Sequence, residues 1–250
     1  MKQKIFFSNI GYARGISGSL KDHITRSGTH FYHSPPAQKR VLDQVKDIIV
    51  KEDPDLCCFV EIEQGSFFTG FYNQIEALTD DDHHYFDVAD KYGGRLHSRL
   101  PFHRGKSNGF IAKNNYAYEK IYFTRGAKRL IYRFSLPGGI EYYFAHFSLN
   151  AQTRQAQLKE IRDIVLGRPY EAIIMADFNI LQGLKELAPI TDDGALRLLN
   201  KESDYTFTFH KRRLVLDLCL CTAGLVGKID LKIIPQPFSD HAALLASVNL

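Results

Sequence analysis

Apolar residues along the chain recur with two different periods, and together these predict a mixed α/β protein. Lys4–Ile10 and Asp55–Ile62 are short apolar runs typical of buried strands. Ala37–Glu52 and Ala151–Leu166 instead carry apolar residues at helical spacing, and Pro54 ends the first of these helices. Ser66–Leu78 also has helical spacing, with aromatic residues on one broad face. We expect that face to pack in the core; membrane insertion is the alternative.

The second half of the chain is predicted to be mostly strands. The predicted strands are Gly109–Ala112, Tyr116–Thr124, Lys128–Ser135, Ile140–Phe147, Ala172–Asp177, Tyr205–Phe209, Leu214–Cys221, Lys228–Ile234 and Ala242–Val248. Asn114–Asn115 and Pro137–Gly139 between them are typical of hairpin turns. Two sheets with a few long crossover helices are therefore expected. No glycine fingerprint of a dinucleotide site or P-loop follows any predicted strand, which argues against nucleotide-cofactor chemistry.

Composition is that of an ordinary globular protein. Of the 250 residues, 44% are hydrophobic and 24% charged. No linker-like, low-complexity or repeated segment divides the chain, so we expect a single domain over residues 1–250. No apolar run is long enough for a signal peptide or a transmembrane segment. The four cysteines lie inside apolar runs and are expected to be buried and reduced, which makes the cytoplasm the default location.

The net charge of +4 is a mild basic bias, but the basic residues are concentrated. Lys91–Lys106 contains no acid, and Lys120–Arg133 contains none either. These stretches are either a solvated positive surface or contacts for phosphate groups, as in a nucleic acid.

Polar side chains stand where several apolar runs end or are interrupted. These residues are Asn9, Glu61, His146, Asp177, Asn179, Asp217, Asp240 and His241. Each has an ordinary structural explanation, such as a turn, a cap or, for Asp217, a pair with Arg212 or Arg213. Their joint occurrence is more informative, because strand ends at one edge of a sandwich bring distant residues together. A carboxylate beside an apolar strand is costly unless it is paired or binds metal.

The set is chemically coherent as a phosphate-ester site. Glu61 and Asp240 offer the hard oxygen ligands that Mg²⁺ or Mn²⁺ prefers. Asp177 is suited to orient or deprotonate the attacking water, with His146 as general acid or phosphate ligand.

The remaining residues of the set are suited to stabilise the negative charge that develops on the phosphate oxygens during hydrolysis. Asn9 and Asn179 are expected to donate to phosphate oxygens without adding negative charge. Asp217 is expected to hold the His241 imidazole in its charged form.

In its ordered motifs the sequence resembles the endonuclease/exonuclease/phosphatase superfamily, which has the deoxyribonuclease-I-like fold. The motifs are Ser8-Asn9-Ile10, Asp53-Pro54-Asp55 before Glu61, Asn108-Gly109-Phe110-Ile111, His146-Phe147-Ser148-Leu149, Asp177-Phe178-Asn179, Leu216-Asp217 and Ser239-Asp240-His241. The resemblance implies an α+β fold, a four-layer α/β/β/α sandwich of two packed mixed sheets flanked by helices. It also implies divalent-metal-dependent hydrolysis of phosphate esters, with Asn108 and Arg154 among the substrate contacts. Ala176 and Val60 depart from the usual Gly and Gln, but every expected catalytic side chain is present.

The sequence leaves the substrate open. A phosphodiesterase or nuclease is the first interpretation, because the basic stretches favour an extended anion. A phosphatase or phospholipase acting on inositol phosphates or lipid headgroups is the alternative, and a non-catalytic polyanion-binding module is the second alternative. The polar stretch Gly11–Ser34 follows Asn9 and is expected to border the site and to close over substrate. The sequence does not indicate an oligomeric state.

Overall fold

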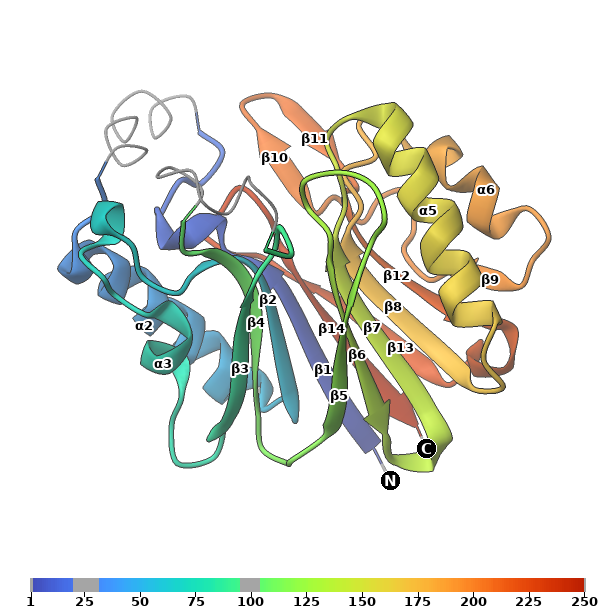
Figure 1. Cartoon of the computed structure of the whole chain (residues 1–250), viewed down its shortest axis with the longest axis horizontal. Helices are drawn as coiled ribbons and strands as arrows, with labels where there is room; N and C mark the ends of the chain where they lie inside the picture. The colour runs from blue at the N-terminus through green and yellow to red at the C-terminus, as the bar shows by residue number, and fades with distance from the viewer. Residues whose placement is uncertain (1, 20–31, 95–103, 250) are drawn as a thin grey trace.

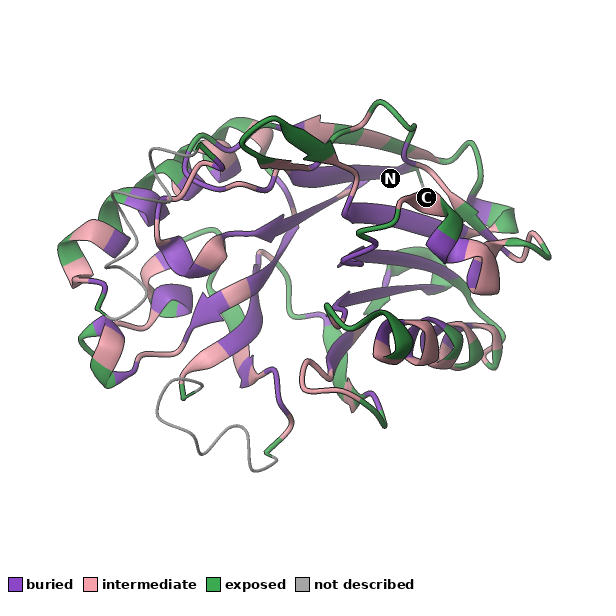
Figure 2. Ribbon diagram, turned by 90° about the horizontal axis from the view of Figure 1, so that it is seen from above, coloured by how far each residue is buried: buried purple, intermediate pink, exposed green. Residues whose placement is uncertain are grey.

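The computed structural model describes residues 2–19, 32–94 and 104–249. Within these residues two six-stranded sheets pack face to face, and helices cover their outer faces (Figure 1). Figure 2, seen from above, shows the two layers of mostly buried strands between helices whose outer sides are exposed. This is the expected four-layer α/β/β/α sandwich, so the predicted fold class is confirmed.

The first sheet has the strand order β13-β14-β1-β2-β4-β3. Its strands are β1 (Lys2–Asn9), β2 (Leu56–Glu63), β3 (Tyr85–Asp90), β4 (Lys106–Ala112), β13 (Ile229–Ile234) and β14 (Ala243–Asn249). At the centre, β1 is parallel to β2 and antiparallel to β14. The N-terminal and C-terminal strands of the described chain are therefore neighbours.

The second sheet has the order β5-β6-β7-β8-β12-β9. Its strands are β5 (Ala117–Tyr122), β6 (Leu130–Leu136), β7 (Ile140–His146), β8 (Glu171–Asp177), β9 (Leu196–Leu198) and β12 (Asp217–Thr222). β7 and β8 are parallel, and the other pairs are antiparallel. A small ribbon, β10 (Phe207–Phe209) with β11 (Arg212–Leu214), stands beside this sheet at the upper end in Figure 1.

Helices form where the sequence supplies helical periodicity and end signals. α2 (Pro35–Glu52) begins with proline in its first turn and ends at Asp53, whose left-handed backbone precedes Pro54. α5 (Ala151–Leu166) begins after Asn150, whose side chain accepts a hydrogen bond from the Thr153 amide. The shorter helices are α3 (Gln74–Leu78), α6 (Ala188–Thr191) and the single 3₁₀ turns η1 (Gly11–Ala13), η3 (Phe67–Thr69), η4 (Pro137–Gly139), η5 (Leu184–Leu187) and η6 (Ala223–Leu225).

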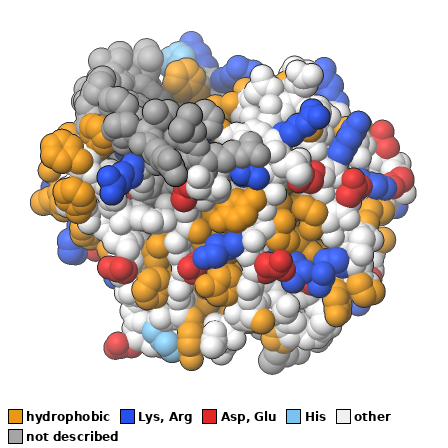
Figure 3. All heavy atoms as spheres, viewed as in Figure 1, with side chains coloured by type: hydrophobic (Ala, Val, Ile, Leu, Met, Phe, Trp, Pro, Cys, Tyr) orange, Lys and Arg blue, Asp and Glu red, His pale blue; other side chains and the backbone are white. Residues whose placement is uncertain are grey.

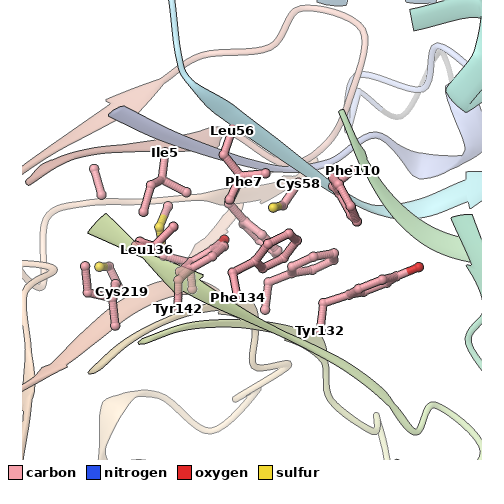
Figure 4. Packing of buried hydrophobic residues seen from close by; sticks show 14 of the residues in the cluster. Ile5, Phe7, Leu56, Cys58, Phe110, Tyr132, Phe134, Leu136, Tyr142 and Cys219 are labelled. Carbon is pink, nitrogen blue, oxygen red and sulfur yellow. The ribbon is translucent and has the colours of Figure 1, made fainter. Parts of the chain in front are cut away.

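In the part of the chain that the structure describes, three hydrophobic clusters hold the four layers together. One lies between α2 and α3 and the first sheet, and another between α5 and α6 and the second sheet. The third joins the two sheets, and Figure 4 shows its side chains from both sheets pointing toward one another. Its centre is aromatic: the Tyr132 and Phe144 rings stack with centroids 4.8 Å apart, and Phe110 meets Phe134 edge-on at 4.8 Å.

Two local predictions were wrong. The continuous helix over Ser66–Leu78 is broken because Gly70 and Phe71 both have positive φ, which leaves a 3₁₀ turn and the short α3. Ile75 and Leu78 are buried as expected, but Phe67 and Phe71 are 73% and 74% exposed. Asn114–Asn115 is not a hairpin turn, because β4 and β5 belong to different sheets. The hairpin turn at Pro137–Gly139 is confirmed.

Among the described residues, no helix is both long enough and apolar enough to span a membrane.

Two buried glutamines tie the helical layer to the segment that follows β1. The Gln74 amide donates to the carbonyl of Tyr12 and to Gln38, and its oxygen accepts from the Glu63 amide, all at 2.8–3.0 Å. Gln38 in turn donates to the carbonyls of His33 and Thr69. This network fixes η1 against the end of β2.

We expect Gln74→Leu to lower the free energy of unfolding by about 2–3 kcal/mol, because it leaves buried polar groups of Tyr12, Glu63 and Gln38 without partners. Urea denaturation of the purified variant measures this. Gln152→Leu, at an exposed position of α5, is the matched control and should change stability by less than about 0.5 kcal/mol. Equal effects of the two substitutions would show that the network contributes nothing particular.

Candidate active site

The second sheet places three of the expected residues side by side. His146 ends β7, Asp177 ends the parallel strand β8, and Asp217 begins the antiparallel strand β12. In the registers of these pairs, His146 lies opposite Asp177 and Asp177 lies opposite Asp217. All three are at most 2% exposed. One sheet edge thus carries a buried row of two carboxylates and an imidazole.

Asp177 is the centre of this row. Its Oδ2 accepts from the Asn9 side chain at 3.0 Å and lies 3.2 Å from His146 Nε2. Its Oδ1 accepts from the backbone N–H of Asn179 at 3.0 Å. Burial alone would raise the pKa of Asp177, but the nearby His146, His241 and Lys128 groups outweigh it and hold the pKa below the usual range. Asp177 is therefore ionised at neutral pH.

Asn9 and Asn179 are both held by the protein. Asn179 has the left-handed backbone φ of 51°, and its side chain donates to the Phe147 carbonyl at 2.9 Å. Asn9 lies at the end of β1, so its bond to Asp177 connects the first sheet with the second. Each side-chain amide has a second N–H that these bonds do not use.

Asp217 and His241 form a pair next to Asp177. Asp217 Oδ2 is 2.7 Å from His241 Nδ1, while Thr206 Oγ1 accepts from the Asp217 amide at 2.8 Å. The alternative that Asp217 pairs with Arg212 or Arg213 is therefore wrong. Burial alone would lower the pKa of His241, but the Asp217 carboxylate outweighs it and raises the pKa to about 10. His241 is charged at neutral pH.

Glu61 reaches the same centre from the first sheet. It lies in an irregularity of β2 between Phe59 and Ile62, and its φ is +54°. The pKa of Glu61 would rise on burial, yet its neighbours Lys91, His146 and Lys128 outweigh burial and lower it to about 2. A bulge of this kind turns a side chain out of the regular alternation of the strand.

Asn108 and Asp240 flank Glu61. Asn108 lies on β4 opposite the bulge, is 1% exposed, and its Oδ1 has no hydrogen-bond partner among the described residues. Asp240 and Glu61 line one pocket of about 210 Å³ together with Arg14, Ile16 and Phe238. This pocket is an opening beside the carboxylates in which a small charged group fits.

A divalent cation fits this set of side chains. Ligand atoms of Asp177, Asp217 and His241 lie within 4.8 Å of one another. Within the described part of the chain, the buried Oδ1 atoms of Asp217 and Asn108 also lack hydrogen-bond partners. His241 Nδ1 is already hydrogen-bonded to Asp217. The carboxylate oxygens of Asp177 and Asp217 therefore suit a cation better than this imidazole nitrogen does. Oxygen donors are the ligands of Mg²⁺ and Mn²⁺.

Two site residues were missed at the sequence level, Lys91 and Lys128. Their ammonium nitrogens lie 3.9 and 4.0 Å from Glu61 Oε1, and Lys128 also contacts His146 Nε2. Burial lowers the pKa of Lys91 to about 7 and lowers that of Lys128. Both belong to the basic stretches recognised in the sequence, but nothing in the pattern distinguished them from their exposed neighbours.

His146 Nε2 can hydrogen-bond to either Asp177 or Lys128, depending on which ring nitrogen carries the proton. Burial, assisted by the charge of Lys128, lowers the pKa of His146 to about 4, so the ring is neutral and carries one N–H. With the proton on Nε2 it donates to Asp177; with the proton on Nδ1 it accepts from Lys128.

Arg154 is not placed to contact a substrate, which corrects the sequence-based expectation. Its side chain is 1% exposed and forms a buried ion pair with Glu186. The guanidinium also donates to the carbonyls of Ser148 and Leu149 at 3.0 and 2.9 Å. Arg154 therefore fixes the loop after His146.

The segment expected to close over substrate and the first basic stretch are described only in part. Residues 20–31 of the Gly11–Ser34 stretch and residues 95–103 of the Lys91–Lys106 stretch lie outside the described residues. Arg14 and Ile16, from the described part, line the pocket beside Glu61. This segment therefore borders the site as expected, and its closure over substrate stays a prediction.

We expect Asp217→Asn to lower the pKa of His241 well below its value of about 10, because burial then loses its largest opponent and only the more weakly acting Asp177 and Asp240 still raise the pKa. A histidine proton NMR titration of the folded variant measures this pKa. A His241 that stays charged above pH 8 in the variant would show that Asp217 is not what holds the proton.

We expect Arg154→Ala to reduce the free energy of unfolding by about 3–5 kcal/mol, because it leaves Glu186 buried without its partner. Arg162→Ala, which removes the partly exposed pair with Asp193, is the control and should cost at most about 1 kcal/mol. Chemical denaturation compares the two, and a small loss for Arg154→Ala would reopen a role in substrate binding.

The Endonuclease/Exonuclease/phosphatase family matches residues 18–241. No curated protein matches the chain by sequence.

Solved structures share the fold at low identity. An endonuclease/exonuclease/phosphatase family protein from Leptotrichia buccalis is 17% identical, with a TM-score of 0.67 over 99% of this chain and 100% of that one. TDP2 from Caenorhabditis elegans is 14% identical, with a TM-score of 0.66 over 100% of this chain and 75% of that one. The endonuclease domain of TRAS1, a telomere-specific retrotransposon, is 11% identical, with a TM-score of 0.63 over 100% and 99%.

The family match extends over most of the chain, from before the first long helix to the histidine that pairs with Asp217. The chain therefore belongs to the endonuclease/exonuclease/phosphatase family, whose members hydrolyse phosphoester bonds.

Proposed function

We propose that this protein is a divalent-metal-dependent phosphodiesterase that acts on a nucleic acid. The observation that carries the proposal is the meeting, around Asp177, of an asparagine from the first sheet and the His241–Asp217 pair beside the second. Glu61 lies within 4 Å of His146 in the same cluster. Nucleophile-orienting, charge-stabilising and cation-binding groups are thereby within reach of one phosphate.

Asp177 and His241 have complementary roles in this proposal. Asp177 is an ionised acceptor that orients the attacking water, and its low pKa makes orientation a larger contribution than complete removal of a proton. His241 is an imidazolium with its Nε2–H free of the bond to Asp217, and it stabilises the negative charge that develops on the phosphate oxygens.

Asn9, Asn179 and His146 complete the phosphate contacts. The two amides offer their second N–H groups to non-bridging oxygens. His146 is neutral at neutral pH, so of the two roles considered for it, phosphate ligand is favoured over general acid.

We assign Glu61 and Asp240, which line one pocket, as the residues that hold Mg²⁺ or Mn²⁺. When bound, the ion supplies Lewis-acid stabilisation of charge on the phosphate. Asp177 and Asp217, whose oxygens lie close together, are the second set able to hold an ion.

Basic residues near the site support a nucleic acid as substrate. Arg14 lines the pocket, and Arg125 and Arg129 lie with Lys128 on the turn between β5 and β6. On the face drawn in Figure 3, Lys and Arg side chains are present along the upper edge, the end of the sandwich that carries the site. One structural neighbour is an endonuclease domain.

A lipid-headgroup or inositol-phosphate hydrolase is the second candidate, and one observation favours it. Phe67 and Phe71 are exposed aromatic side chains on the connection between β2 and α3. Exposed aromatic residues suit insertion into a lipid surface. Salt separates the candidates, since nucleic-acid binding weakens steeply as salt rises and apolar insertion does not.

The test is hydrolysis of a substrate panel by the purified protein with Mg²⁺, Mn²⁺ or EDTA. The panel contains bis-p-nitrophenyl phosphate, p-nitrophenyl phosphate, single-stranded and double-stranded DNA, RNA and a phosphoinositide. We expect diester cleavage that needs the metal and that falls by about 10²–10⁴-fold in Glu61→Gln and in His241→Ala.

The matched controls are Glu202→Gln and His210→Ala, which make the same changes at exposed positions. They should retain wild-type rates. Folded protein that binds DNA but cleaves no member of the panel would contradict the proposal and support a non-catalytic binding module.

A further inference from the structure

Lys91 and Lys128 converge on one point of the site from the two sheets. Lys91 follows β3 of the first sheet, and Lys128 precedes β6 of the second. Their side chains are only 3% and 17% exposed, and both ammonium groups face the same Glu61 oxygen. Neither lysine has a role in the mechanism above.

The two ammonium groups have hydrogen-bond donors to spare. Each carries three N–H groups. Within the described ranges, Lys91 bonds to the Tyr12 hydroxyl and Lys128 contacts His146 Nε2. Their distances to Glu61, 3.9 and 4.0 Å, are too long for hydrogen bonds. Two N–H groups per lysine thus remain for another acceptor, and buried donors without acceptors are costly.

The charged groups around the two lysines are compatible with an anion that accepts these hydrogen bonds. Asp217 is paired with His241, and Glu61 and Asp177 both lie beside His146. The nitrogens of Lys91 and Lys128 lie 3.9 and 4.0 Å from the same Glu61 oxygen. A phosphate anion at this point therefore meets two basic side chains as well as the carboxylates.

The backbone fixes both lysines before any ligand binds. The Lys91 carbonyl accepts from the amides of Arg129 and Leu130 at 2.8 and 3.3 Å, which joins the two sheets at the site. The Gln157 side chain of α5 donates to the Lys128 carbonyl at 2.8 Å. A Cβ at Gly126 would lie 2.8 Å from Gln157 Nε2, so glycine is what allows this close approach. Preorganised donors lose little entropy on binding.

We propose that Lys91 and Lys128 bind the non-bridging oxygens of the substrate phosphate, so that the protein holds the phosphate group without its divalent metal. This rests on the proposed function, since it assigns a further role within the same site. The two lysines act as substrate-binding residues, and the metal is then needed for turnover rather than for capture of the phosphate.

The experiment measures binding in EDTA, where hydrolysis plays no part. Isothermal titration calorimetry of the intact chain uses two probes, inorganic phosphate and bis-p-nitrophenyl phosphate. We expect the wild type to bind both, and Lys91→Met and Lys128→Met each to weaken binding by about tenfold or more.

Three further variants make the result interpretable. Lys120→Met is the matched control, because Lys120 lies on the same hairpin but pairs with Asp87 instead of Glu61. It should bind as the wild type does. Lys91→Arg and Lys128→Arg retain the charge and should retain most of the binding, and thermal melts show which variants are folded. The wild-type measurement in EDTA stands even if a methionine variant does not fold.

The outcomes separate this inference from the proposed function. Metal-dependent hydrolysis by a wild type that binds neither probe in EDTA would overturn the lysine assignment and leave the function standing. Unchanged binding by folded Lys91→Met and Lys128→Met would also overturn it. Lysine-dependent binding in EDTA, by a protein that hydrolyses nothing with metal, would support the phosphate site and contradict the proposed enzyme.

Discussion

A negative charge on Asp177, a residue that is 1% exposed, is the constraint on which the rest of the site depends. A buried carboxylate stays ionised only if hydrogen bonds and positive groups replace the water it has lost. Here the partners are Asn9 at the end of β1, His146 at the end of β7, and the backbone amide of Asn179, which lies two residues after Asp177. Satisfying one charge therefore requires both sheets to be correctly packed. The site is therefore complete only in the fully packed sandwich.

The sandwich makes that packing possible. The aromatic cluster between the sheets sets their separation, and the Lys91 carbonyl and the Asn9 side chain connect them at the upper end in Figure 1. Glu61 enters the site only because β2 leaves its regular register there, with a positive φ that a non-glycine residue adopts at some cost. Buried groups that serve the fold alone, such as the Arg154–Glu186 pair, lie beside those that serve the site. Burial alone does not distinguish the structural groups from the site groups; their hydrogen-bond partners do.

Much of this was predictable because strand ends are visible in a sequence. Runs that end in Asn9, Glu61, His146 and Asp177 indicated which edge of each sheet carries chemistry, and the helix over Ala151–Leu166 followed from its spacing. Three features were not predictable. β3, with exposed Tyr85 and Phe86, lacks an apolar run, and the short β9 was missed as well. The positive φ of Phe71, which breaks the helix after Ser66, has no signature in residue type. Nothing in residue type marks Lys91 and Lys128, because their position beside Glu61 is created by tertiary contacts.

The central claim is that the charge on Asp177 serves catalysis and not only the fold. The most direct measurement compares the rate of metal-dependent hydrolysis of bis-p-nitrophenyl phosphate with the unfolding free energy for wild type and Asp177→Asn. Our account predicts a folded variant whose rate falls by about a thousandfold, since asparagine keeps the shape but loses the ionised acceptor. A folded Asp177→Asn variant that hydrolyses the diester at the wild-type rate would contradict it.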